Sequence, residues 1–306
     1  MTILNGAAAW RSGQNRWIGL ATGLTALIAA AAWMSHRESI AVIRHEARYR
    51  PIADSSGETT SAPPVSASSA RHPLDDALEF VQPSLEALKS VKDYTAVFTK
   101  TELVHDRLLT QKMDMKFREH PFSVYFHGHT KCKAGREVIF VAGRNDDKLI
   151  VHEVGLRAIV GTMNLSTDDP KVMATNRHPI TQVGIAKLIE SAVDIWNHEK
   201  ATLDPANIEV HLVHSVQVGE VECEAVEINH HHPQPGLDYQ VGRVYLDKQS
   251  RLPVQAEMFD WPAATGEDPP LLERYTYTDL KTNVGLSDSD FDPHNREYRF
   301  AVSQRD

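Results

Sequence analysis

Residues 94–126 read YTAVFTKTELVHDRLLTQKMDMKFREHPFSVYF, and the pattern of this stretch decides the fold class. Apolar side chains stand at every second position of 94–98 and again of 113–117, where charged residues separate them. A period of two residues is typical of an antiparallel strand with one apolar face and one face in water. The second run ends before Pro121, because proline cannot donate to the hydrogen-bond ladder of a sheet. The stretch therefore predicts successive antiparallel strands.

The chain on either side of this stretch adds more strands and two amphipathic helices. Strand-like runs recur at 122–126, 138–141, 149–151, 208–213, 216–218, 221–228, 241–247, 252–259 and 272–280. Apolar residues at helical spacing predict a helix over 74–88, in which Pro83 predicts a kink or a division into two shorter helices. A second helix is predicted from an N-cap at Thr181 to about Glu199. Together these elements predict one α+β domain, in which a curved antiparallel sheet is covered on one face by helices.

The N-terminal part of the sequence predicts a membrane anchor. Trp17 to Met34 is an apolar run, WIGLATGLTALIAAAAWM, that contains no charged residue. At about 1.5 Å per residue, a helix of this length spans roughly 27 Å, close to the hydrocarbon core of a bilayer. Arg11 and Arg16 precede the run, so residues 1–16 are expected to stay in the cytoplasm while the rest of the chain crosses. A cleaved signal peptide is the alternative to a single transmembrane helix, with the small residues at 29–32 as its cleavage site.

Two segments of different composition connect this anchor to the domain. Residues 35–50 mix arginine with apolar residues and are expected to form a juxtamembrane segment. Residues 51–73 are rich in Ser, Ala, Pro and Thr, cannot bury enough apolar surface to become ordered, and predict a disordered linker. The domain is expected over 74–300, with a short tail at 301–306. This organisation predicts a single-pass protein of the cytoplasmic membrane, whose domain lies in the periplasm or otherwise outside the cytoplasm.

The charge of the chain argues against a nucleic-acid partner. The formal net charge of the 306 residues is −9. Residues 1–50 hold six Arg, no Lys and two Glu, a balance of +4, so the remaining residues carry −13. A body this acidic argues against a phosphate-backbone partner, which would need a basic face.

Five segments of the body resemble a known group of proteins. They are YTAVFTKTE at 94–102, RLLTQKMDMKFREHPFSVYF at 107–126, GREVIFVAGRNDDKLIVH at 135–152, VYLDKQSRLPVQAEMFDWP at 244–262 and ERYTYTDLKTNVGLSDSDFDPHNREYRF at 273–300. Their order resembles LolA-like envelope proteins and, more closely, the bacterial domain-of-unknown-function family number 1571, over roughly residues 75–300. The resemblance implies a half-barrel whose sheet wraps around helices and encloses an apolar cavity. In LolA-like carriers that cavity holds the acyl chains of lipoproteins or lipids.

The resemblance implies no catalytic residue, and the chain departs from the soluble carriers in one respect. A predicted membrane segment precedes the domain, so free diffusion across the envelope, as of a lipoprotein shuttle, is not expected. The favoured function is a non-catalytic, membrane-tethered binding protein for a lipid or another apolar ligand, such as a lipoprotein acyl chain. The candidate lining residues are Phe98, Met113, Met115, Phe117, Met258 and Tyr275.

Two other interpretations remain open at this point. The same six residues could be ordinary core, and the chain would then be an interaction or scaffolding module of the envelope with a filled core. A metal-dependent enzyme is the least favoured interpretation. His127 and His129 with Cys132 form H-x-H-x-x-C, and histidines two apart on a strand point to one face, but no second set of ligands accompanies them.

Neither a metal site, a cofactor nor a catalytic residue is therefore predicted. The run His230-His231-His232 precedes a proline-rich loop and is expected to be solvated, at most a weak adventitious metal site. The sequence contains no GxSxG, HExxH or phosphate-loop motif. Its two cysteines, Cys132 and Cys223, are expected to be small buried thiols, with a single bridge as the alternative outside the cytoplasm.

Overall fold

The computed structural model describes residues 49–52, 71–130, 134–155 and 161–300. The predictions for the cytoplasmic N-terminus, the transmembrane segment, most of the juxtamembrane segment and linker, the tail, and Cys132 lie outside the described residues. Within those residues, no helix has the length and apolar character needed to cross a membrane. Cys223 is a buried free cysteine, as expected.

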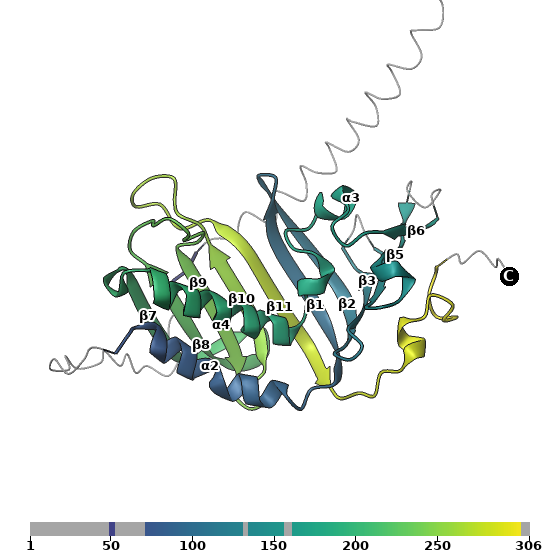
Figure 1. Ribbon diagram of the computed structural model, residues 1–306, viewed down its shortest axis with the longest axis horizontal. Helices are drawn as coiled ribbons and strands as arrows, with labels where there is room; N and C mark the ends of the chain where they lie inside the picture. The colour runs from purple at the N-terminus through teal and green to yellow at the C-terminus, as the bar shows by residue number, and fades with distance from the viewer. Residues whose placement is uncertain (1–48, 53–70, 131–133, 156–160, 301–306) are drawn as a thin grey trace, which may run out of the picture. The chain divides into compact units, whose positions relative to one another are not determined.

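Eleven strands form one antiparallel sheet in the described part of the chain, and Figure 1 shows them side by side. The strands are β1 (Asp93–Val104), β2 (Arg107–Arg118), β3 (Ser123–Gly128), β4 (Glu137–Val141), β5 (Leu149–His152), β6 (Thr162–Leu165), β7 (Ile208–Val218), β8 (Val221–His230), β9 (Val241–Asp247), β10 (Pro253–Phe259) and β11 (Leu271–Thr282). Their order across the sheet is β6-β5-β4-β3-β2-β1-β11-β10-β9-β8-β7. The sheet thus consists of two meanders, β1 to β6 and β7 to β11, which join where β1 pairs with β11.

Two long helices cover one face of this sheet, which is called the helix face below (Figure 1). The helices and helical turns are α2 (Leu74–Leu88), η1 (Asn145–Asp147), α3 (Pro170–Met173), η3 (Ile180–Gln182), α4 (Ile185–Thr202), η4 (Pro205–Asn207) and η5 (Asp288–Phe291). Val81 of α2 and Ile189 of α4 are fully buried against Val244 and Leu246 of β9. The alternate residues of β9, Arg243 among them, belong to the opposite face, called the outer face.

Three local predictions differ from the structure. Helix α2 is one helix rather than the two shorter helices that Pro83 allowed, and its buried face continues past the exposed proline to Ser84. Helix α4 begins after Gly184, whereas Thr181 belongs to η3. Residues 208–218 form one strand, because a bulge between Val213 and Val216 absorbs the break in the pattern.

Gly184 explains why α4 starts where it does. Its φ angle of +129° is one that L side chains rarely adopt. A Cβ atom there would lie 2.9 Å from Cζ of Phe117, so the backbone can approach β2 only at a glycine. The position of Gly184 therefore sets the start of α4 over the helix face of β1 and β2.

Two segments outside the sheet pack on its outer face. Residues 286–300 lie over β3 and β4, where Tyr298 stacks on Tyr125 with ring centroids 4.2 Å apart. At the other meander, the guanidinium of Arg243 lies 4.7 Å from the ring centroid of Tyr49 and donates to the carbonyl oxygen of Arg50 at 2.7 Å. Three residues assigned from sequence to the juxtamembrane segment and linker, Tyr49, Arg50 and Ile52, thus contact the sheet.

Candidate functional site

A cavity of about 790 Å³ lies on the helix face, between the sheet on one side and α4 with the chain leading into it on the other. Its apolar wall includes Val138 and Val151 from one meander, Val244 from the other, and Ile195 of α4. Interiors of folded proteins are close-packed and contain few voids larger than a water molecule. A space of this size exceeds the voids of an ordinary close-packed core and lies within the size range of ligand pockets.

The six predicted lining residues all belong to the helix face, because the strand registers place them there. Phe98 pairs with both Met113 and Tyr277, and Met258 pairs with Glu273 next to Tyr275. The cavity wall contains four of the six, namely Phe98, Met113, Met258 and Tyr275.

Met115 and Phe117 are not among the residues that line this cavity. Both are 1% exposed and lie in the apolar core beneath the start of α4. The ring of Phe117 stacks on Tyr94 at a centroid distance of 4.8 Å and contacts the backbone at Gly184. The first turn of α4 packs on this part of the sheet, so the two side chains are buried in the core and not exposed to the cavity.

A cluster of charged residues forms one part of the cavity wall, at the seam between the two meanders. Lys100 and Glu102 continue the inward alternation of β1, and Glu273 and Tyr275 occupy the matching positions of β11. The ammonium of Lys100 donates to Oε2 of Glu102 at 2.6 Å, and the hydroxyl of Tyr275 donates to Oε1 of the same carboxylate at 2.8 Å. Glu102 is 2% exposed, and Lys100 and Glu273 are each 9% exposed, so the cluster is shielded from water.

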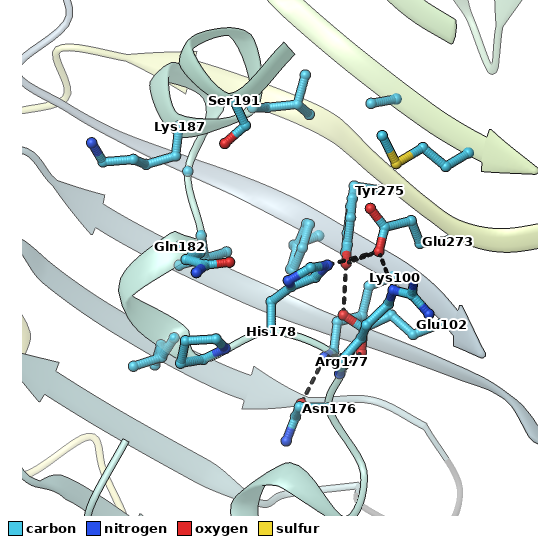
Figure 2. A pocket seen from close by; sticks show the side chains of 18 of the residues that line it. Lys100, Glu102, Asn176, Arg177, His178, Gln182, Lys187, Ser191, Glu273 and Tyr275 are labelled. Atoms are coloured by element: carbon cyan, nitrogen blue, oxygen red, sulfur yellow. Dashed lines mark hydrogen bonds and ion pairs between the residues drawn. The ribbon is translucent and has the colours of Figure 1, made fainter. Parts of the chain in front are cut away.

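Residues 176–178 close over this cluster from the helix side, as Figure 2 shows. Asn176 accepts from Lys100 at 2.6 Å, and the backbone N–H of Arg177 donates to Glu102 at 3.2 Å. The guanidinium of Arg177 and the ring Nε2 of His178 lie 3.0 and 2.8 Å from the same oxygen of Glu273. Every charged group of the cluster therefore has an oppositely charged partner.

Burial and these contacts shift the ionisation of two groups in the cluster. Burial lowers the pKa of Lys100 below its ordinary value, although the neighbouring Glu102 carboxylate opposes this shift. The hydrogen bond with Glu273 raises the pKa of His178 above its ordinary value. His178 is thus the group whose protonation couples the closing segment to pH.

We expect this coupling to appear as a pH dependence of stability. A raised pKa in the folded state stabilises the protein fully below the ordinary histidine value of about 6.5, and the stabilisation is lost as pH rises through the raised value. The thermal unfolding midpoint should therefore fall across this interval in the wild type and fall less in His178→Asn. The exposed His231→Asn is the control and should follow the wild type. Identical pH profiles for His178→Asn and the wild type would contradict the role of the Glu273 contact.

The charged cluster was not predicted from sequence, although the sequence pattern of β1 does place two of its members on the inner face. Lys100 and Glu102 follow Phe98 at even spacing, so the pattern that placed Phe98 on the inner face placed two charges there as well. Charges on the buried face of a strand are rare unless they are paired. Their partners at 176–178 come from a connection without regular pattern, and no local signal in it identified them.

A second buried polar group lies at the C-terminal end of α4. Glu199 is 4% exposed, lines the cavity together with Trp196 and Tyr239, and has its Oε2 3.4 Å from Nε2 of His230. His230 is fully buried at the end of β8, which differs from the solvated loop expected for it. The two residues after it, His231 and His232, are exposed. The cavity wall is thus mixed, with apolar side chains from the sheet and α4 and polar groups that include the charged cluster and Glu199.

Comparison with solved structures gives similarities in fold at low sequence identity. A DUF1329 family protein from Desulfovibrio piger is 12% identical, with 72% of this chain and 98% of that chain covered and a TM-score of 0.33. Lipoprotein LppX of Mycobacterium tuberculosis is 15% identical, with 70% of this chain and 99% of that chain covered and a TM-score of 0.39. A LolA superfamily protein from Nitrosomonas europaea is 11% identical, with 71% of this chain and 97% of that chain covered and a TM-score of 0.28. TM-scores this low do not transfer a ligand or an activity to this chain.

The sequence of the chain identifies its family. No curated protein matches the chain. The family model described as "Protein of unknown function (DUF1571)" matches residues 91–300, which is more than half of the chain and agrees with the resemblance carried by the five segments. The chain therefore belongs to the DUF1571 family.

Proposed function

We propose that this chain is a non-catalytic binding protein that holds the apolar part of an amphipathic lipid in the cavity of its helix face. The observation that carries the proposal is the cavity itself, of about 790 Å³. This size lies within the range of about 300–1,000 Å³ that ligand pockets occupy. Its wall combines apolar side chains from both meanders and α4 with a smaller number of polar groups, as the walls of ligand pockets commonly do.

The two kinds of wall suit a ligand with an apolar chain and a polar head. Phe98, Met113 and Met258 offer aromatic and flexible thioether surface, which adapts to an irregular chain. The cluster around Lys100 and His178 offers hydrogen-bonding groups where a head group would otherwise lose its contacts with water. The lipid is therefore expected to lie with its chain along the apolar wall and its head near residues 176–178.

The absence of catalysis and the location are parts of the same proposal. Each carboxylate of the cluster is already held by a cation and by the hydroxyl of Tyr275, so neither is poised as a general base. The predicted anchor at 17–34 would hold the domain at the cytoplasmic membrane, on the side away from the cytoplasm. The ligand is then a lipid or a lipoprotein acyl chain drawn from that surface.

The test uses residues 47–306, which form one compact unit, purified from cells without detergent. Native mass spectrometry followed by solvent extraction is expected to find one lipid per chain. In fatty-acid titrations each added methylene should strengthen binding by about 0.8 kcal/mol, so two methylenes should lower Kd by roughly 15-fold until the cavity is full. A protein that is folded, empty as purified and indifferent to fatty acids would sink the proposal.

A matched pair of variants separates the cavity from the rest of the surface. Ala192 of α4 lines the cavity and Asn197 of the same helix is exposed and does not. Ala192→Trp should weaken fatty-acid binding by about 100-fold or more, because the indole fills the space that the acyl chain needs. Asn197→Trp should bind like the wild type. Equal binding by the two variants would place the lipid elsewhere.

A further inference from the structure

A group of side chains of the types that bind metal ions lies on the outer face, away from the cavity. Asp114 of β2 pairs in register with His127 of β3, and His129 follows two residues later on the same side. Oδ2 of Asp114 lies 2.7 Å from Nε2 of His129 and 3.7 Å from Nδ1 of His127. One ligating atom from each of the three residues lies within 4.8 Å of the others. The histidine pair singled out in the sequence thus has a third partner on the neighbouring strand.

These distances are close to the spacing of ligands around a tetrahedral metal ion. Zinc binds histidine nitrogen and carboxylate oxygen at about 2.0–2.2 Å, so two ligand atoms of one tetrahedron lie about 3.3 Å apart. The separations of 2.7 and 3.7 Å, both measured from Oδ2 of Asp114, fall on either side of this value, and the two histidine nitrogens lie within 4.8 Å of each other. We propose that Asp114, His127 and His129 bind a zinc ion, with water in the fourth position. This inference is independent of the proposed lipid site, which lies on the other face.

The surroundings support a bound cation more than a simple ion pair. His127 is paired with Asp114 on one side and with Glu137 on the other, so carboxylates flank it from both neighbouring strands. Glu137 is not itself a ligand, because its two oxygens already accept from the Tyr125 hydroxyl and the Arg299 backbone N–H.

Solvent can reach the three ligands and the fourth position. The side chains of Asp114, His127 and His129 are 52%, 32% and 43% exposed. Asp114 and His127 also line a cleft of about 560 Å³ on the outer face, whose wall includes Glu297 and Lys281. Two histidines with one carboxylate and an open position form the kind of set that accepts zinc and leaves a coordination place for water.

The experiment is calorimetric titration of Zn²⁺ into the full chain, stripped of metal with a chelator and solubilised in detergent. One Zn²⁺ per chain is expected to bind, and the thermal unfolding midpoint should rise with it, because a ligand of the native state alone stabilises that state. His127→Asn with His129→Asn should weaken binding by about 100-fold or more. Asp114→Asn, which keeps the shape but removes the charge, should also weaken it.

The matched control replaces the other exposed pair of neighbouring histidines, His231→Asn with His232→Asn. These residues follow β8 and are the expected source of adventitious binding. The control should bind Zn²⁺ like the wild type. The proposal is overturned if the control loses binding and the His127 and His129 variant keeps it, or if the wild type takes up no zinc. Circular dichroism of each variant checks that the sheet has formed.

Discussion

Replacing Glu102 by glutamine is expected to lower the free energy of unfolding by about 3 kcal/mol, because it leaves the buried ammonium of Lys100 without its counter-charge. The Glu102 side chain is 2% exposed, and its carboxylate accepts from Lys100, from Tyr275 and from the backbone of Arg177. Glutamine keeps the size of the side chain and removes the charge, so the loss reports the electrostatic contact. Urea denaturation of residues 47–306 measures the change in unfolding free energy.

Two further variants decide whether burial is the cause. Glu86 and Lys89 form an exposed pair at the same distance, 2.6 Å, and Glu86→Gln should change stability little because water screens the pair. Adding Lys100→Met to Glu102→Gln removes the stranded charge and should recover most of the loss. A cost for Glu102→Gln no larger than that for Glu86→Gln would contradict this account of the cluster.

Phe117→Ala is expected to be the most damaging single substitution in the sheet, with a loss of about 4 kcal/mol. The ring is 1% exposed and stacks on Tyr94, meets Phe122 edge-on at 5.3 Å, and fills the space beside Gly184. Its removal leaves a cavity at the start of α4, where the neighbouring backbone is fixed by the glycine. Urea denaturation provides the measurement.

The same variant also separates packing from ligand binding. Phe117 does not line the cavity, so the folded fraction of Phe117→Ala should bind fatty acid like the wild type. Met258 is only partly buried and does line it, so Met258→Ala should lose less stability and more affinity for fatty acid. The opposite ranking of the two variants would show that the apolar wall has been assigned to the wrong residues.

Alternation was enough to predict most of the sheet, and it failed where a distant contact decides the local structure. The runs at 94–98 and 113–117 gave both the strands and the face of each side chain, because the period of two is a property of the backbone itself. The start of α4 was missed because Thr181 is a good N-cap by local rules, whereas Gly184 begins the helix for the sake of a contact with Phe117. Of the two outcomes predicted at Pro83, division into two helices does not occur, since α2 is one helix through the proline.

In the candidate site, too, local pattern predicts some residues, and distant contacts place the others. The inward position of Lys100 and Glu102 could be predicted from the alternation of β1 alone. The common face of His127 and His129 could be predicted from their spacing of two residues. The partners that give these groups a role come from elsewhere in the chain: Asn176 and His178 for the cluster, and Asp114 for the histidines. Register and long-range closure place such partners, and a single sequence without related sequences does not specify them.

The seam between the two meanders has a consequence for how the protein is made. Each meander pairs neighbours in sequence, but β1 and β11, which hold the charged cluster between them, come from opposite ends of the domain. Contacts of long sequence separation form late and slowly, because the chain between them must first be ordered. Helix α2 precedes β1 yet packs on β7 and β8, which strengthens this dependence. During synthesis the cavity cannot be completed until β11 has left the ribosome, so a ligand of the proposed kind could be held only after the two meanders have joined.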